Sequence, residues 1–319
     1  MTQLGRSTWL LKGMLLLSLC LLFSDAQAGN RRYKLKYQNL TRYYFVHIPP
    51  PQKQGKSALV INLHGGGSHG RSQEEFSNMD KTADKYGFYV VYPNGTGKLH
   101  DRLLTWNAGD CCGYAQEHEI DDVGFIAKVM DAVIKQFPID SQRVYVTGMS
   151  NGAMMAYYLA ENLPERIAAI APVAGGRMPD ASKPLKPMPI MHFHSLDDPR
   201  ALYHGGLGPS FPGSNYRIMH PDIDQVLASW AKIDGCEPQR KQVDERTYKT
   251  DKKLHHAREY VYQDCKLAPV FLWQLDKAGH VWPGGRQNYM ERVLGQSTNV
   301  INANETMWQF FQQFRVRNP

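Results

Sequence analysis

Long hydrophobic runs, internal repeats and interdomain linkers are all scarce in this chain of 319 residues. The apolar run Met14–Phe23 falls well short of the ~20 residues that a helix needs to span a bilayer. Composition and the absence of long repeats exclude a collagen, a coiled coil and a multi-span membrane protein. Because no Ser/Thr- or Pro-rich stretch divides the chain, we expect residues 29–319 to form a single catalytic domain with no appended module.

Charge of one sign is not in great excess either. The chain has 37 Lys and Arg against 30 Asp and Glu, a formal charge of +7, and the basic residues are scattered apart from short clusters such as Arg31–Arg32 and Lys252–Lys253. Such a pattern is typical of a solvated basic surface, so we expect no nucleic-acid partner. Hydrophobic residues make up 42% of the chain, enough to bury a core and to disfavour disorder.

The first 28 residues have the layout of a secretory signal peptide. Arg6 and Lys12 precede the apolar run, and Ala26-Gln27-Ala28 supplies a small-x-small cleavage site. The sequence therefore predicts a secreted protein, periplasmic or extracellular, that keeps no stable membrane anchor after cleavage.

Cysteines are few: beyond the predicted signal peptide the chain keeps Cys111, Cys112, Cys236 and Cys265. An even number in an exported protein points to disulfides, with three possible connectivities. We expect Cys236 and Cys265 to form a disulfide, which leaves Cys111 and Cys112 as a vicinal pair or as free thiols. No CxxC spacing or paired-His helix accompanies them, so no metal site is expected.

Strands and helices alternate along the chain. Strands are predicted at 33–37, 43–48, 58–63, 88–92, 144–147, 168–173, 190–194 and 271–275, and helices at 74–86, 120–137, 152–161, 222–233 and 305–314. Residues 93–118 read as a long functional loop. This order predicts an α/β fold with a mostly parallel central sheet and helices on both faces.

The strongest chemical signal is Gly148-Met149-Ser150-Asn151-Gly152, a G-x-S-x-G motif between a strand and a helix. The turn at such a site is so sharp that side chains flanking the serine would collide, which explains the glycines. It holds the Ser150 hydroxyl clear of the sheet at its C-terminal edge, so Ser150 is predicted to be a nucleophile.

A serine nucleophile needs a base, and the base needs an acid that orients it. Among twelve histidines His280 is the best placed, since it follows the last predicted strand in a loop with glycines on both sides. His192 and His194 fall inside a predicted strand. The loop after that strand offers two acids, Asp197 and Asp198, between which the residues alone give little choice.

The third element is Leu63-His64-Gly65-Gly66-Gly67, directly after a buried strand. Glycines there expose backbone N–H groups and let a substrate carbonyl approach. We expect the N–H groups of Gly66 and Asn151 to form an oxyanion hole, with Gly67 as the alternative to Gly66. His64 is expected to be structural.

Several segments together resemble a known family. They are LHGGG, WNAGDCCG (106–113), IDDVGF (120–125), RVYVTGMSNGAMMAY (143–157), AAIAPVAG (168–175), HSLDDP and GHVWPGG, in this order. The chain resembles the secreted esterases similar to polyhydroxybutyrate (PHB) depolymerases, which include the feruloyl and acetylxylan esterases of carbohydrate esterase family one. The resemblance implies an α/β-hydrolase fold, the triad Ser150, Asp198 and His280, and a substrate cleft lined by Trp106 and Trp282.

Two departures from the polyester-degrading members bear on the substrate. Those members usually carry Cys and Gln in the oxyanion loop, where this chain has Gly66 and Ser68, and they tend to append a polymer-binding domain. The resemblance therefore favours a serine esterase acting on feruloyl or acetyl esters of plant polysaccharide fragments, with a PHB or hydroxyalkanoate oligomer as the alternative. A prolyl-oligopeptidase-like peptidase and a non-catalytic carbohydrate-binding protein are less favoured, and no cofactor is expected. Residues 203–216, rich in Gly and aromatic residues, are predicted to border the acyl pocket.

Overall fold

The computed structural model describes residues 28–51, 55–210, 216–249 and 254–316. The predicted signal peptide lies outside the described residues except for Ala28. Among the described residues, no helix is long and apolar enough to cross a membrane.

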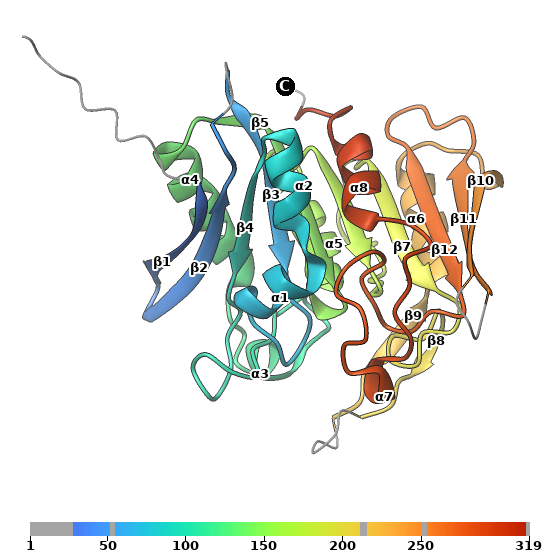
Figure 1. Cartoon of the computed structure of the whole chain (residues 1–319), viewed down its shortest axis with the longest axis horizontal. Coiled ribbons are helices and arrows are strands. Elements are labelled where there is room, and N and C mark those ends of the chain that lie inside the picture. The colour runs from blue at the N-terminus through green and yellow to red at the C-terminus, as the bar shows by residue number, and fades with distance from the viewer. Residues whose placement is uncertain (1–27, 52–54, 211–215, 250–253, 317–319) are drawn as a thin grey trace, which may run out of the picture.

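A ten-stranded sheet forms the centre of the molecule (Figure 1). Its middle is made of six parallel strands: β4 (Tyr89–Pro93), β3 (Ser57–Leu63), β5 (Ile139–Met149), β6 (Ala169–Val173), β7 (Ile190–Ser195) and β12 (Val270–Asp276). Antiparallel strands extend both ends: β2 (Leu40–Ile48) and β1 (Gly29–Tyr37) beyond β4, and β11 (Leu254–Tyr262) and β10 (Arg240–Lys249) beyond β12. The parallel strands are nearly all buried because both faces are covered, whereas β1 and β10 are largely exposed.

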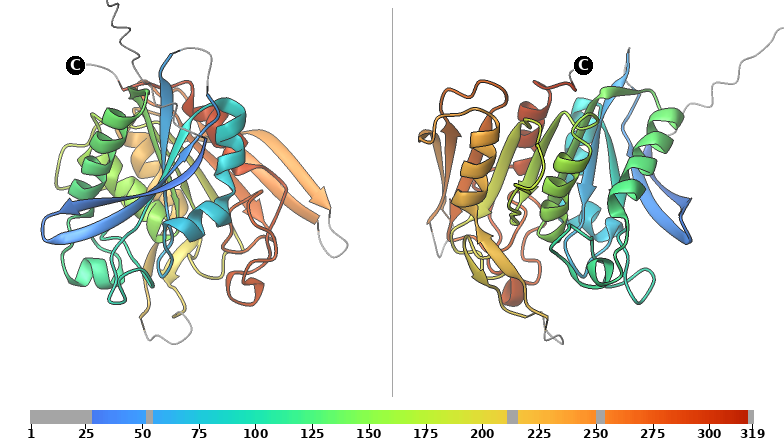
Figure 2. Two further views of the ribbon diagram at one scale, coloured as in Figure 1. Left: turned by 60° about the vertical axis from the view of Figure 1, so that its left-hand side comes forward. Right: turned by 180° about the vertical axis from the view of Figure 1, so that it is seen from behind.

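Helices pack on both faces of the sheet (Figure 2). One face carries α4 (Asp122–Gln136), α5 (Asn151–Asn162) and α6 (Ile223–Ile233), and the other carries α1 (Gly70–Ser77), α2 (Met79–Tyr86) and α8 (Ala303–Phe311). Each face has its own hydrophobic core, with Trp230 central to the first and Trp308 to the second. The expected α/β fold with a mostly parallel sheet is confirmed.

The single helix predicted at 74–86 is wrong, since two helices occupy this region. Asn78 separates them with φ 57°, a left-handed conformation that asparagine tolerates better than most residues. Its N–H donates to the carbonyl of Glu74 and so ends α1. The apolar periodicity alone did not reveal this break.

Several short elements were not predicted. They are α3 (Gly113–Glu117) in the long loop, the separate strand pair β8 (His204–Leu207) and β9 (Met219–Asp222), and α7 (Glu291–Leu294). Strand β10 was also not delimited, because its sequence RKQVDERTYK is charged on both faces and lacks the alternation of a half-buried strand.

Both pairs of cysteines form disulfides. The predicted Cys236–Cys265 disulfide is confirmed, and Cys111 and Cys112 form a vicinal disulfide rather than free thiols. The first joins the end of α6 to the segment after β11, and the second lies in the loop before α3.

Candidate active site

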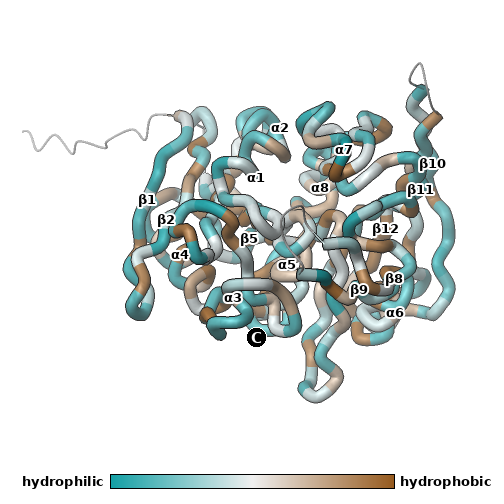
Figure 3. The backbone as a smooth tube through the Cα atoms, turned by 90° about the horizontal axis from the view of Figure 1, so that it is seen from below, coloured by the Kyte–Doolittle hydropathy of each residue, from teal (hydrophilic) through white to brown (hydrophobic). Residues whose placement is uncertain are grey.

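Ser150 occupies the turn between β5 and α5, at the edge to which the parallel strands point. Its backbone has φ 58° and ψ −120°, a conformation that non-glycine residues rarely adopt outside sites where the surrounding structure enforces it. The Ser150 N–H donates to the carbonyl of Val173 at the end of β6 (2.9 Å). The residue is half-buried, with its neighbours fully buried. Figure 3 looks onto this edge of the sheet, where α1, α3, α7 and the β8–β9 pair lie.

The glycines of the G-x-S-x-G motif are required by close backbone contacts. A Cβ atom on Gly148 would lie 2.6 Å from the carbonyl oxygen of Gly152, and one on Gly152 would collide with the carbonyls of Leu63 and His64. The start of α5 is thus packed directly against the end of β3. This packing brings the oxyanion-loop sequence next to Ser150.

The glycine loop after β3 lies against Ser150 and Asn151. A Cβ atom built on Gly65 would be 3.5 Å from Cβ of Ser150, and one on Gly66 would be 3.6 Å from Cβ of Asn151. The Gly67 N–H is already used, because it donates to the carbonyl of Leu104 (2.8 Å). Within the described part of the chain, the N–H groups of Gly66 and Asn151 form no such bond. Of the two expected alternatives, this geometry favours Gly66.

His64 is a structural residue in this loop. Its Nδ1 contacts the carbonyl of Gly65 (2.8 Å), and its Nε2 accepts the N–H of Gly95 (2.9 Å). Burial lowers the pKa of His64 to about 3, so the ring stays neutral, with its proton on Nδ1. Both ring nitrogens are occupied, which leaves none for proton transfer with a substrate.

Trp106 joins three segments around the glycine loop. Its backbone N–H donates to Oδ1 of Asn151 (2.7 Å), its carbonyl accepts from Nδ2 of Asn151 (3.0 Å), and its indole N–H donates to the carbonyl of His64 (2.9 Å). Trp106 and Trp282 are 0% and 1% exposed. The contacts observed for both are packing and hydrogen bonds, including one from the Trp282 indole to Asn304 (2.8 Å), so their role in a substrate cleft stays a prediction.

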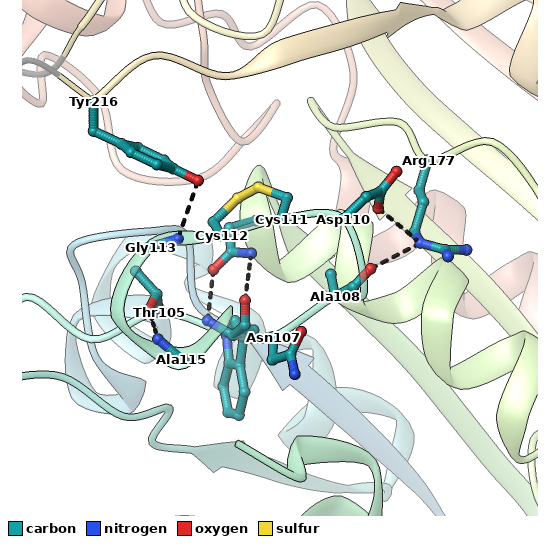
Figure 4. The surroundings of a disulfide bond; sticks show 12 residues. Thr105, Asn107, Ala108, Asp110, Cys111, Cys112, Gly113, Ala115, Arg177 and Tyr216 are labelled. Atoms are coloured by element: carbon teal, nitrogen blue, oxygen red, sulfur yellow. Dashed lines mark hydrogen bonds and ion pairs between the residues drawn. A yellow bond between two sulfur atoms is a disulfide. The ribbon is translucent and has the colours of Figure 1, made fainter. Parts of the chain in front are cut away.

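The vicinal disulfide lies in the loop that carries Trp106 (Figure 4). The Cys112 N–H donates to the carbonyl of Trp106 (3.0 Å), and the Ala108 N–H donates to Cys111. Next to the disulfide, the Tyr216 hydroxyl accepts the N–H of Gly113 (3.3 Å), so the end of the segment 203–216 contacts this loop. Residues 211–215 of that segment lie outside the described residues.

Asp198 and His280 meet at the same edge from two different loops. Asp198 follows β7 and His280 follows β12, and their side chains form a hydrogen bond between Oδ2 and Nδ1 (2.8 Å). The other carboxylate oxygen of Asp198 accepts the N–H groups of Arg200 (2.7 Å) and Ala201 (2.9 Å). Both side chains are buried. Within the described residues, no hydrogen bond joins the Ser150 hydroxyl to His280, and such contacts are often long in enzymes without substrate.

The electrostatics keep Asp198 ionised. Burial alone would raise its pKa, but the charge of His280 and hydrogen bonds from His194 and His280 outweigh burial and hold the pKa well below its usual range. A charged carboxylate at Nδ1 of His280 fixes the proton on that nitrogen and leaves Nε2 free to act as a base.

Asp197, the other acid of the same loop, lies elsewhere. It is exposed, and its carboxylate accepts the backbone N–H of Lys277 (2.6 Å). It therefore ties the loop after β7 to the loop after β12, three residues before His280. The structure brings Asp198 and not Asp197 to His280.

Three further histidines lie close to Asp198 or are linked to it through another histidine, and they were not predicted as part of the site. His192 and His194 lie on β7, and His220 lies on β9 close enough for the charges of His280 and Asp198 to act on it. The signal in the sequence was the His-x-His spacing, which places both rings on one face of a strand that ends at the acid. Among the described residues, no group of three or more His, Cys, Asp or Glu side chains is arranged to hold a metal ion.

Comparison with known proteins gives a consistent family. The family model described as esterase PHB depolymerase matches residues 42–245. The chain is 30% identical to feruloyl esterase B of Piromyces equi over 212 residues, which is 63% of this chain and 37% of that protein. It is 31% identical to poly(3-hydroxyalkanoate) depolymerase C of Paucimonas lemoignei over 189 residues, 58% of this chain and 44% of the relative. The matches thus span less than half the length of both relatives.

A solved structure supports the fold. The acetyl xylan esterase from Aspergillus awamori superposes with a TM-score of 0.58 at 15% identity, covering 88% of this chain and 99% of that one. At this identity the likeness shows the fold alone. The expected α/β-hydrolase fold is confirmed by this neighbour together with the sheet topology.

Proposed function

The chain belongs to the PHB depolymerase family of carboxylic ester hydrolases, and from this premise we propose that it is a secreted serine esterase acting on feruloyl or acetyl esters of plant polysaccharide fragments. In this proposal residues 29–319 form one catalytic domain. The observation that carries it is the meeting of Asp198 and His280 at the sheet edge where Ser150 occupies its sharp turn.

The proposed mechanism uses three side chains. His280 takes the proton of the Ser150 hydroxyl as that oxygen attacks the ester carbonyl, and it passes the proton to the leaving alcohol. Asp198 holds His280 in the required tautomer and stabilises the imidazolium. Water activated by His280 then hydrolyses the acyl-enzyme by the same route.

The N–H groups of Gly66 and Asn151 stabilise the oxyanion of each tetrahedral intermediate. Their support is that Gly66 lies against Asn151 while the neighbouring N–H of Gly67 is engaged by Leu104. Removing one donor of this type typically costs roughly 3–4 kcal/mol of transition-state stabilisation. Because these donors belong to the backbone, the site requires no cofactor for this step.

Two classes of ester are candidates for the substrate. The similarity to a feruloyl esterase supports an ester of a plant polysaccharide, and the similarity to a poly(3-hydroxyalkanoate) depolymerase, at nearly the same sequence identity, supports a polyester oligomer. Gly66 and Ser68, in place of Cys and Gln of the dedicated polyester enzymes, favour the first class.

The test is kcat/KM on methyl ferulate, an acetylated xylo-oligosaccharide and a soluble 3-hydroxybutyrate oligomer. We expect a preference of ~100-fold or more, about 2.7 kcal/mol, for a ferulate or acetyl ester. The same preference for the hydroxybutyrate oligomer would establish the alternative. Ser150→Ala is the control, and it should abolish both turnover and labelling by a fluorophosphonate probe without unfolding the protein. Full activity in that variant would overturn the serine mechanism.

A further inference from the structure

His192 and His194 lie on one face of β7, inside the protein, just before the strand leads to Asp198. Their exposed fractions are 0% and 1%. The rings stack with centroids 5.3 Å apart, and Nε2 of His192 is 3.1 Å from Nδ1 of His194. Two polar rings are therefore buried together beside the acid, where each nitrogen needs a hydrogen-bond partner.

All four ring nitrogens have partners. The Tyr157 hydroxyl on α5 contacts Nδ1 of His192 (2.9 Å), which begins the series. At its other end, Nε2 of His194 contacts the carbonyl oxygen of Ala201 (2.7 Å) and lies 3.5 Å from Oδ2 of Asp198. The series thus runs from the helix behind the sheet to the turn that holds Asp198.

With both rings neutral, only one arrangement of protons satisfies this series. A carbonyl oxygen can only accept, so the Nε2–H of His194 donates to Ala201. His194 Nδ1 then accepts from the Nε2–H of His192, and His192 Nδ1 accepts from Tyr157. Each group in the series therefore donates to the next one, in the direction from Tyr157 to Ala201.

The surroundings support this arrangement. Burial lowers the pKa of His192 well below its usual value, with a further lowering from His194, and burial raises the pKa of Tyr157 well above 10, so the tyrosine keeps its proton to donate. The groups facing His194 from other segments are Asp198, His280, His220 and the ring of Tyr203, which stands edge-on at 5.6 Å. Burial, together with the charge of His280, lowers the pKa of His220 to about 4.

We propose that His194 is a positioning residue for the acid–base pair: it holds the 198–201 turn through the Ala201 carbonyl, and His192 and Tyr157 fix its orientation. The inference rests on the proposed function. In this turn the N–H groups of Arg200 and Ala201 donate to Oδ1 of Asp198, so fixing the backbone of Ala201 keeps Oδ2 directed at His280. The Nε2–H group of His194 also lies 3.5 Å from Oδ2 of Asp198, the oxygen that His280 contacts at 2.8 Å.

Two substitutions at one position separate the donor from the packing. His194→Phe fills the space but removes both ring nitrogens, whereas His194→Gln keeps an N–H donor toward Ala201 and Asp198. His47→Gln is the matched control, because His47 is also buried and hydrogen-bonded to an acid, Asp84 (2.7 Å), but lies on β2 away from the site.

The measurement is kcat and KM on methyl ferulate, or on the best ester found, across the pH range. For His194→Phe we expect kcat to fall ~10-fold or more with KM unchanged, in the range reported for residues that orient a catalytic ligand. The acidic limb of the pH profile should move to lower pH, because a less well held Asp198 stabilises the His280 imidazolium less. His194→Gln should have most of the wild-type kcat and an acidic limb close to that of the wild type. In His47→Gln both the kcat and the position of the acidic limb should be unchanged.

Two outcomes would overturn the proposal. One is a His194→Phe enzyme whose kcat and acidic limb stay within twofold of the wild type, and the other is a Gln variant as impaired as Phe. If His194→Phe does not fold, Tyr157→Phe decides, since it removes only the hydroxyl at the far end: a threefold loss of kcat with a shifted limb is expected, and an unchanged profile refutes the series. A wild type that neither turns over esters nor reacts with fluorophosphonate would instead refute the proposed function.

Discussion

The two sides of Ser150 are built in different ways. On the oxyanion side, the glycine loop, Trp106 and the start of α5 are joined by hydrogen bonds in which one partner is always a main-chain group, and a vicinal disulfide lies in the loop that carries Trp106. On the acid–base side, Asp198 and His280 come from loops 82 residues apart in sequence and are held by buried side chains. The first side presents fixed dipoles, and in the proposed mechanism the second side holds a charge and moves a proton.

Histidines show the same contrast. His64 on the oxyanion side is neutral and fully occupied by backbone partners, since burial lowers its pKa to about 3. On the acid–base side, Asp198 remains charged although it is buried, because His280 and His194 supply charge and hydrogen bonds. Removing a side chain should therefore disturb the second side more than the first.

The largest effect is expected at the acid. In Asp198→Asn the amide can no longer accept the proton of His280 Nδ1 in the same way, so the ring adopts the wrong tautomer, and kcat should fall about 10⁴-fold. Steady-state kinetics on the best ester measure this loss.

Asp197→Asn is the matched control for that variant. Asp197 is exposed and caps the Lys277 N–H, so kcat should stay within about twofold of the wild type. Equal losses in the two variants would mean that the acid is not Asp198.

The two disulfides give the next contrast, in stability. Cys236 and Cys265 are 29 residues apart, and replacing both by alanine frees a long loop in the unfolded chain, which should lower the free energy of unfolding by about 3–4 kcal/mol. Urea unfolding of the mature protein measures this change.

Replacing Cys111 and Cys112 together by serine serves as the comparison. Adjacent cysteines close almost no loop, so the entropic effect on unfolding should be under about 1 kcal/mol. A larger loss here than in the other pair would show that the loop next to Trp106 contributes to global stability rather than to local shape.

A smaller effect is expected on the oxyanion side. Asn151→Ala keeps the backbone N–H but loses both side-chain hydrogen bonds to Trp106. We therefore expect kcat to fall roughly 10-fold with little change in KM. This loss is smaller than the 10²–10³-fold fall in kcat that is typical when an oxyanion donor is deleted. Asn162→Ala at the other end of α5 is the control, since the partners of its amide among the described residues are the carbonyl of Tyr158 and the Lys183 side chain. Wild-type activity in Asn151→Ala would mean that Trp106 does not position this side.

The oxyanion side was also the easier one to predict from the sequence. Gly-rich loops and the G-x-S-x-G turn are local patterns, because steric limits on a few neighbouring residues dictate them. The central strands β3 and β6 were found for a similar reason, since each is a continuous apolar run.

The acid–base side depends on contacts that no local pattern encodes. Asp197 and Asp198 are chemically identical neighbours, and only the tertiary placement of Lys277 and His280 separates them. The series from Tyr157 to Ala201 spans three elements, and the split of the helix at Asn78 depends on one left-handed residue. Strand β10 escaped prediction because the edge of a sheet imposes no buried face.

The last prediction concerns a buried carboxyl near the start of β7, the strand that leads to Asp198. Asp234 follows α6 and is fully buried; its Oδ1 accepts the Met188 N–H (3.0 Å), while its Oδ2 has no hydrogen bond among the described residues. Burial raises its pKa to about 8, against about 4 in the unfolded chain. The neutral acid is thus favoured in the fold, and stability that is fully present below about pH 4 is lost as pH rises to about 8.

Asp234→Asn removes this titration. The stability of the variant relative to the wild type should rise steadily between pH 4 and 8, with the largest gain at the upper end. Thermal unfolding at both pH values measures the difference. A variant whose Tm difference from the wild type does not change with pH would contradict it.

The outermost strands of the sheet have a consequence for how the protein behaves in concentrated solution. An edge strand offers its unpaired main-chain groups to any other extended chain and can seed aggregation. Both edges here carry rows of charged side chains: Arg31, Arg32, Lys34 and Lys36 on β1, and Arg240, Lys241, Asp244, Glu245, Arg246 and Lys249 on β10. Joining two such edges would force these charges into a shared, partly dehydrated interface. The ten-stranded sheet therefore resists growth by addition of further strands.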